Sequence, residues 1–211
     1  MIYFNSKFFT LLLIASTPLA LTAHSYVDEI INLSYKNLTS LYELHHIHHP
    51  HTVRILDLSH NNIESLSSFS FDAFTHLEEL YISHNNIADL PLGLFDRLTS
   101  LKVIDLSHNK LQAVSPWTFD CLKSLRMLDL SYNRVDTLPT DIFYKNDQLR
   151  VLRLSNNRLR HLSACIFDKN SKLNALDLSF NDLTTVPLGI FDRLKRMHTL
   201  DLTGNQLNNY Y

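Results

Sequence analysis

Aspartate, serine and histidine recur in this chain at the short spacing that hydrolytic enzymes use. Asp57, Ser59 and His60 form one such group. A hydrolase needs a nucleophile, a base and an orienting carboxylate that converge in one pocket. Here Asp-x-Ser or Asp-x-Thr returns five times, always at multiples of 24 residues, which places these side chains in parallel columns. We therefore expect no catalytic residues, no enzyme activity and no cofactor.

A second chemical signal is a histidine-rich segment between residues 45 and 51. Neutral imidazoles are good ligands for zinc and copper, but Glu43 is the one nearby carboxylate and no cysteine lies close in the sequence. A metal site, a pH-sensitive loop and a solvated loop without a role are the three interpretations. We assign no metal ion, and the candidate ligands are His45, His46, His48, His49 and His51.

The spacing of asparagine shows how these residues must be positioned. An asparagine returns at every 24th residue, a phenylalanine follows ten residues later in six copies, and apolar residues stand five and three positions before each asparagine. Self-similarity at a fixed period is the signature of a solenoid. The asparagines are Asn61, Asn85, Asn109, Asn133, Asn157, Asn181 and Asn205.

Each copy predicts a short strand followed by a turn. In the alternating segment Leu56 to Ser59, the two leucines point to one side and Asp57 and Ser59 to the other. Stacked copies make a parallel sheet, and neighbours supply the apolar cover that a single unit lacks. Asparagine suits the turn because its amide both donates and accepts hydrogen bonds inside the coil.

The segment VRILDLSHNNIESL, from Val53 to Leu66, matches the pattern L-x-x-L-x-L-x-x-N-x-L and resembles the leucine-rich repeat family. The resemblance covers residues 28 to 211. The period and the phenylalanine column are similar to the typical extracellular class, which includes Toll-like receptors, chaoptin-type and Slit-type proteins and small leucine-rich proteoglycans. The resemblance implies an α/β solenoid, a horseshoe of about eight repeats with the parallel sheet on its concave face.

The first residues read as a leader. Lys7 is followed by a short apolar run and then small residues, which is typical of a secretory signal peptide. We expect a signal peptide over residues 1–25, cleaved at about residues 22–25, and a repeat domain over residues 26–211. No later apolar stretch is long enough to span a bilayer. The predicted location is secreted and extracellular.

The two ends of the repeat array differ from its middle. Lys36 replaces the first asparagine, and one extra residue between Leu41 and Ile47 is expected on the convex side or in a loop. The last repeat is incomplete, so we expect self-association through its uncapped edge, and the chain can equally be a truncated piece of a receptor ectodomain. Cys121 and Cys165 lie two repeats apart, too far for a disulfide, and are expected to be buried thiols.

Two N-glycosylation sequons fall in the first repeat. Asn32-Leu-Ser and Asn37-Leu-Thr both have the acceptor pattern. In a secreted protein, glycans at these positions would keep another chain from stacking on the N-terminal edge. The alternative is that Asn32 is skipped because it lies on a strand.

The outward strand positions carry the chemical variety that the core positions lack. Most of these positions are aspartate, but Tyr81 and Arg153 depart from the pattern. Arg153 has a second interpretation, which is charge balance between Asp129 and Asp177. Tyrosine and arginine are frequent hot-spot residues. The candidate protein-binding residues are Tyr81, Asp105, Asp129, Arg153, Met127, His84, His108 and Tyr132.

Charge and resemblance together define the expected function. The 19 Lys and Arg against 21 Asp and Glu give a net charge of -2, so nucleic-acid binding has no electrostatic support. The resemblance implies recognition of an extracellular protein ligand or receptor in innate immunity, adhesion or development. A structural or matrix scaffold is the alternative, favoured by outward columns that are mostly uniform.

Overall fold

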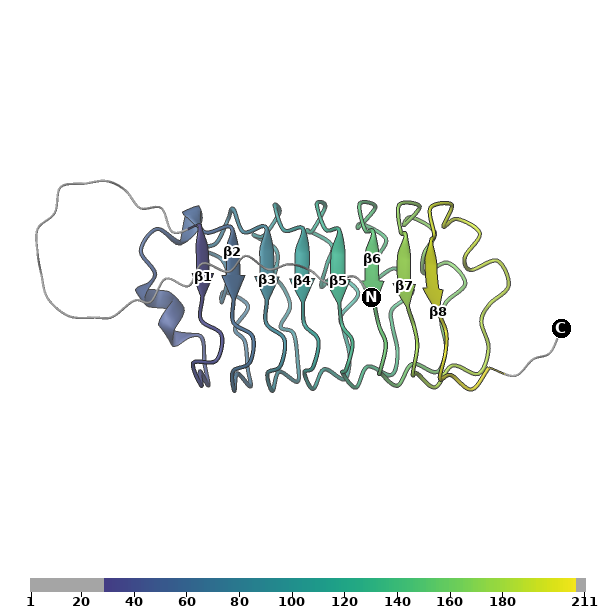
Figure 1. Cartoon of the computed structure of the whole chain (residues 1–211). Helices are drawn as coiled ribbons and strands as arrows, with labels where there is room; N and C mark the ends of the chain where they lie inside the picture. The colour runs from purple at the N-terminus through teal and green to yellow at the C-terminus, as the bar shows by residue number, and fades with distance from the viewer. Residues whose placement is uncertain (1–28, 208–211) are drawn as a thin grey trace, which may run out of the picture.

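The computed structural model describes residues 29–207, and within them all strands belong to one parallel sheet. The strands follow one another in chain order across the sheet (Figure 1). The expected signal peptide lies outside the described residues. The strands are β1 (Ile30–Asn32), β2 (Ile55–Asp57), β3 (Glu79–Tyr81), β4 (Val103–Asp105), β5 (Met127–Asp129), β6 (Val151–Arg153), β7 (Ala175–Asp177) and β8 (Thr199–Asp201).

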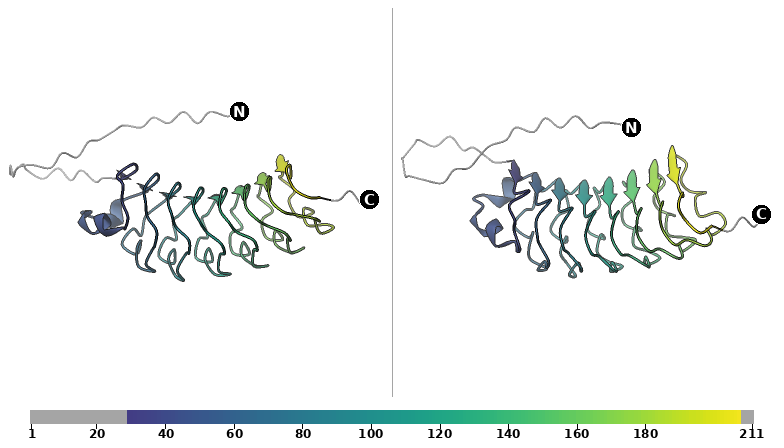
Figure 2. Two further views of the ribbon diagram at one scale, coloured as in Figure 1. Left: turned by 90° about the horizontal axis from the view of Figure 1, so that it is seen from below. Right: turned by 60° about the horizontal axis from the view of Figure 1, so that its bottom comes forward.

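The pairing of the strands follows the period of the sequence. Leu56 pairs with Leu80, and Asp57 pairs with Tyr81, 24 residues further on. The described chain forms a shallow arc with the strands on its inner side (Figure 2). On the outer side the repeats are connected by turns. The predicted solenoid with a parallel concave sheet is therefore confirmed, with little helix on its convex side.

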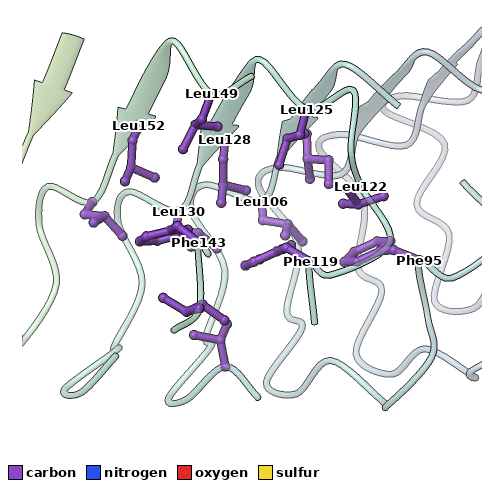
Figure 3. Close-up of a cluster of buried hydrophobic side chains, with 14 of the residues drawn as sticks. Phe95, Leu106, Phe119, Leu122, Leu125, Leu128, Leu130, Phe143, Leu149 and Leu152 are labelled. Atoms are coloured by element: carbon purple, nitrogen blue, oxygen red, sulfur yellow. The ribbon is translucent and has the colours of Figure 1, made fainter. Parts of the chain in front are cut away.

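The interior is filled by the leucine and phenylalanine columns. Leu128 and Leu130 of one repeat are fully buried, as is Phe143 ten residues after the asparagine. Figure 3 shows these side chains inside the coil between the strands and the outer turns. Phe143 and Phe167 stack with their ring centroids 6.3 Å apart. Phe71, Phe95 and Phe119 stack on one another in the same way, as do Phe143, Phe167 and Phe191. Together with the leucines they form one apolar core along the solenoid.

The asparagine that recurs every 24 residues connects two turns of the solenoid. We call it the ladder asparagine, and its place in the repeat the ladder position. The side-chain amide of Asn85 donates to the carbonyls of Leu58, Ile82 and Ser83, at 3.0 to 3.1 Å. Its Oδ1 accepts a hydrogen bond from the backbone N–H of Ile63, at 3.0 Å. Asn109, Asn133, Asn157 and Asn181 repeat this arrangement. Backbone groups that water cannot reach are thereby satisfied.

The alternation predicts that the serines of the repeats lie on the open face of the sheet, but they do not. Each strand ends at its outward position, an aspartate in five of the eight strands, and the serine two residues later is buried, as at Ser59 and Ser131. The Ser131 hydroxyl donates to Oδ1 of Asp129 at 2.6 Å, and its backbone N–H donates to the same atom. The strict period of two therefore stops at the aspartate, because the chain turns there instead of continuing as a strand.

The first repeat carries the extra residue in a short helix. The 3₁₀ helix η1 (Tyr42–His46) occupies the predicted place, with Leu44 buried beneath it, and η2 (Pro50–Thr52) follows. The expectation of two buried thiols is wrong, because Cys121 is half-buried and Cys165 is exposed. Position 165 lies in an outer turn whose side chain faces solvent, so a cysteine there is not part of the core.

The last described repeat is less covered than the others. Leu200 of β8 is 39% exposed, whereas its counterpart Leu176 of β7 is 1% exposed. Leu202 and Leu207 are half-buried. Within residues 29–207, no helix has both the length and the apolar composition that a bilayer crossing requires.

Candidate functional site

The strand register brings the predicted recognition residues into one row on the concave face. Tyr81 of β3 pairs with Asp57 of β2 on one side and with Asp105 of β4 on the other. Arg153 of β6 pairs with Asp129 of β5 and with Asp177 of β7. The first residue of each strand forms a second row, which includes Glu79 and Met127.

Tyr81 is held in place by its own strand. Its hydroxyl donates a hydrogen bond to Oε2 of Glu79 at 2.6 Å. Burial, followed by the carboxylate of Glu79 and the charges of Asp105 and Asp57, raises the pKa of the Tyr81 phenol. Tyr81 therefore stays neutral and presents one face of a fixed ring, an arrangement that lowers the entropy cost of binding.

Arg153 and Asp129 form an ion pair across adjacent strands. Nη1 of Arg153 lies 3.1 Å from Oδ2 of Asp129, and the two side chains are 46% and 9% exposed. The pair agrees with the charge-balance interpretation of Arg153. Asp129 is therefore a poor direct contact for a ligand, because the arginine and Ser131 cover its carboxylate. The exposed part of this pair is the guanidinium, which retains donors for a partner.

The remaining surface around these residues mixes apolar and polar groups. Val103, Met127 and Val151 lie side by side at the start of three adjacent strands and are half-buried. Asp105 also remains half-buried, and its Oδ1 accepts the backbone N–H of Ser107 at 2.9 Å. An apolar centre bordered by a tyrosine and an arginine has the composition of a protein-binding surface.

The turns at the ends of the strands carry a continuous stack of rings, which we call the aromatic row. Neighbouring rings have centroids 4.0 to 4.2 Å apart and planes within 11° of parallel. Each of these residues has a φ between 53° and 57°, a conformation that costs non-glycine residues about 1–2 kcal/mol. The aromatic row consists of Tyr35, His60, His84, His108 and Tyr132.

The two histidines that flank His84 in the stack affect its charge state. Burial, followed by the positive charges of His108 and His60, lowers the pKa of His84, and the carboxylate of Asp105 opposes this effect. Sequence analysis named His84, His108 and Tyr132 as candidate binding residues, but it did not find that Tyr35 and Tyr132 extend the histidine stack at its two ends. The signal was available, since Tyr35 and Tyr132 directly precede the ladder position of their repeats.

A shallow groove of about 570 Å³ lies along the aromatic row and includes two cations that sequence reasoning missed. Lys110 and Arg134 each directly follow a ladder asparagine, and both are exposed. The missed signal is the charge of the column itself, in which residues 110, 134 and 158 are all basic. The side chains that line the groove beside the buried asparagines are His84, His108, Lys110, Tyr132, Arg134 and Asn156.

Two further polar residues were missed inside the convex side. Asn146 and Asn170 are fully buried in a column that is otherwise apolar. The Asn146 amide donates to the carbonyls of Phe119 and Leu122, but its Oδ1 has no partner, and Oδ1 of Asn170 also has none. Their signal was a polar residue three positions after the phenylalanine.

The histidine-rich segment does not come together as a ligand cluster. His45 and His46 pack edge-on against Tyr42 in η1, whereas His49 precedes η2 in a left-handed conformation. Within the described range 29–207, no group of three or more His, Cys, Asp or Glu could hold a metal ion.

In the repeated Asp-x-Ser unit, the serine and the aspartate hydrogen-bond to each other and stabilise the turn. The Ser59 hydroxyl donates to Oδ1 of Asp57 at 2.6 Å, and the ring of His60 stacks in the aromatic row. A serine nucleophile would instead donate to a histidine. The arrangement fixes the turn and does not form a nucleophile and base pair.

Both sequon asparagines are exposed in the first repeat. Oδ1 of Asn32 accepts hydrogen bonds from the backbone N–H and the hydroxyl of Ser34, whereas Asn37 adopts a φ of 58°. The side chain of Asn32 is thus engaged in hydrogen bonds with Ser34, which makes Asn37 the more accessible sequon asparagine.

Comparisons with known proteins agree with this geometry. The family described as "Leucine rich repeat" matches residues 75–135 and 147–207, and "Leucine Rich repeats (2 copies)" matches residues 51–94. No curated protein matches the chain significantly. A solved leucine-rich repeat protein of Leptospira interrogans is 29% identical with a TM-score of 0.68, over 75% of this chain and 39% of that one. The chain therefore spans less than half the length of that protein.

Proposed function

Because the chain belongs to the leucine-rich repeat family, we propose that it recognises a protein ligand through the concave face of its sheet. Domains of this family are generally protein-binding modules and are typically without catalytic activity. The ligand is an extracellular protein or receptor, and the chain is a secreted member of the typical extracellular class. Innate immunity, adhesion and developmental signalling are the settings that this class suggests.

The observation that supports this proposal best is the row from Tyr81 to Arg153. Its four strands place a fixed tyrosine, three apolar side chains and an exposed guanidinium on adjacent β-strands. Large rigid aromatic side chains and arginine supply most of the binding energy at protein interfaces. The fold constrains the residue types of the core leucines, the ladder asparagines and the stacked phenylalanines. The concave face is therefore where residue types can vary between repeats.

Export supports the same proposal. The leader over residues 1–25 and the two sequons suit a protein that passes through the secretory pathway. In secretory cells, the full chain should appear in the medium with a shortened N-terminus. Asn37→Gln should remove a glycan that glycosidase also removes, and Asn32→Gln should have less effect. A chain that stays in the cytosol with Met1 intact would contradict export.

Photo-crosslinking from the concave face tests the proposal directly. Replacing Tyr81 with a photoreactive phenylalanine analogue places the crosslinker at one end of the row, next to Asp105. The control carries the same analogue at Lys169, which is exposed on the convex side. We expect a protein from extracellular fluid to crosslink to the Tyr81 variant and to be absent from the Lys169 variant.

The identified protein then has to bind in isolation. Its purified form should bind the unmodified chain, and excess unmodified chain should suppress the crosslink at position 81. Crosslinks of equal yield from both positions would contradict a concave site. Crosslinking from position 169 alone would place recognition on the convex side.

A further inference from the structure

Three cations form a second row beside the aromatic row. Each directly follows a ladder position, and its backbone N–H donates to a carbonyl of the preceding repeat, at 2.8 to 2.9 Å. Equivalent positions on adjacent strands recur about 4.8 Å apart, so the three backbone positions repeat along the solenoid at about that interval. We call Lys110, Arg134 and Arg158 the cation row.

The charges of the cation row are not neutralised by the chain itself. Within residues 29–207, the ion pairs involve Arg54, Lys102 and Arg153, and none involves the cation row. The row is also bounded, because Asn86 and Asp182 occupy the equivalent positions before and after it. The side chains of the row are exposed, so three adjacent positive charges face solvent.

The groove that joins the two rows is lined by hydrogen-bond donors. Lys110 and Arg134 form one border, and the edges of His84, His108 and Tyr132 form the other. No carboxylate lines this groove, although the concave face beside it carries a column of aspartates. The amides of the buried ladder asparagines are already bonded inside the coil. A ligand of the groove therefore has to be rich in acceptors and negatively charged.

We propose that this groove binds a linear acidic polysaccharide. The sulfate or carboxylate groups of the sugar chain pair with the cation row, and its hydroxyls bond to the ring edges and to Asn156. The ligand runs along the solenoid axis, because the concave aspartates repel a polyanion that crosses the sheet. This site is additional to the concave protein-binding face and does not depend on it.

Other linear polyanions fit the groove less well. Bases of a single-stranded nucleic acid need free aromatic faces on which to stack, but the inner faces of the aromatic row are covered by one another at 4.0 to 4.2 Å. In an extended acidic peptide, side chains on one face recur about every 6.6 Å, which does not match the interval of the cation row. A polysaccharide supplies both anionic groups and hydroxyls along one edge.

The histidines make this binding dependent on pH. Protonated His84 and His108 add positive charge to the groove, next to Lys110 and Arg134. Burial and the neighbouring histidines His108 and His60 lower the pKa of His84, and Asp105 counteracts them. Protonation of His84 therefore needs a pH below the usual titration range of histidine, and a bound polyanion favours the protonated form. Affinity should rise as the pH falls through this range.

Heparin is the probe for a test that compares two basic surfaces. The variant Lys110→Glu/Arg134→Glu changes the groove. The control Lys169→Glu/Lys195→Glu makes the same charge change in a basic pocket of about 520 Å³ on the convex side. Titration calorimetry at about 0.1 M salt should show at least about tenfold weaker binding for the groove variant and less than about twofold for the control. Circular dichroism checks the fold of both.

The salt dependence and the competing probes complete the test. The slope of log K against log salt should fall by about 2 in the groove variant. An equal or larger loss in the convex control overturns the proposal, because the binding then reflects general basic charge. Tighter binding of oligothymidylate or polyglutamate than of heparin, at matched charge, overturns the assignment to a polysaccharide.

A second variant tests the role of the rings. Wild-type affinity for heparin should rise severalfold between about pH 7.5 and about pH 5.5. His84→Gln/His108→Gln should abolish this rise and retain most of the affinity at the higher pH. A rise that persists in this variant would show that the histidines lie outside the site.

Discussion

The ladder asparagine is the residue on which each turn depends. Asn85→Ala removes the Oδ1 acceptor and the Nδ2 donor, which together satisfy four backbone groups. We expect the free energy of unfolding to fall by about 1–3 kcal/mol, since buried backbone groups lose their partners. Urea denaturation measures the change. The adjacent Asn86→Ala is the matched control, because its side chain is partly exposed, and it should cost less than about 0.5 kcal/mol.

The buried asparagines of the convex side should behave in the opposite way. The carbonyls of Phe119 and Leu122 already accept backbone N–H groups, so Asn146→Leu leaves no carbonyl unsatisfied and removes an orphan Oδ1. We expect Asn146→Leu to raise the stability by about 1 kcal/mol. A clear loss of stability in thermal denaturation would mean that Oδ1 has a partner such as an internal water.

The sequence predicts residue roles well where a column is uniform. The ladder positions follow from the 24-residue spacing alone. Asn146 and Asn170 were missed because they stand in a column of core residues such as Leu122, and their burial depends on neighbours that the period does not describe. The burial of Ser59 was missed because alternation was extended past Asp57, where the strand has already ended.

At the scale of the element, the phenylalanine column holds the convex turns against the sheet. Phe143→Ala opens a cavity in the middle of the core, and we expect a loss of about 3–5 kcal/mol in chemical denaturation. Tyr144→Ala, at the next residue, removes a ring of similar size that is half-exposed and lies near Lys145 and Lys169. It should cost less than about 1 kcal/mol. Similar losses for both variants would contradict a dominant core role for Phe143.

The elements themselves could be predicted more completely than their connections. The apolar residues before each asparagine predict the strands β2 to β8 and their register. The helix η1 was predicted only as an insertion, because one extra residue fixes a position and not a conformation. The left-handed turns of the aromatic row were not predicted, because no glycine marks them and a bulky residue such as Tyr132 rarely adopts positive φ. Stacking between repeats offsets part of that cost.

At the scale of the whole molecule, the exposed end of the array should drive self-association. Leu200, Leu202 and Leu207 present apolar surface at β8. Sedimentation should show oligomers of the 211-residue chain, and an added polar capping repeat should yield monomer. Leu188→Glu, at a fully exposed convex position, should leave the distribution unchanged. Monomer in the unextended chain would count against this account.

The fold alone does not select a ligand for the molecule. In all, 458 chains of solved structures match this one significantly, so specificity has to come from departures within the repeats. The charge distribution is one departure: residues 29–120 carry 5 basic and 11 acidic residues, and residues 121–207 carry 13 and 9. The cation row spans this change, with Lys110 before it and Arg134 and Arg158 after it. The opposite charges of the two parts nearly cancel, so the net charge of the whole chain is only -2.

The central claim is that recognition occurs on the concave face, and the affinity for the crosslinked partner tests it most directly. Tyr81→Ala and Arg153→Ala are compared with the convex control Lys169→Ala, after circular dichroism has shown that all three are folded. We predict that each concave variant loses about 2 kcal/mol of binding free energy, over about twentyfold in affinity, and that the control binds normally. Unchanged affinity in both concave variants, with a loss in Lys169→Ala, would contradict the account.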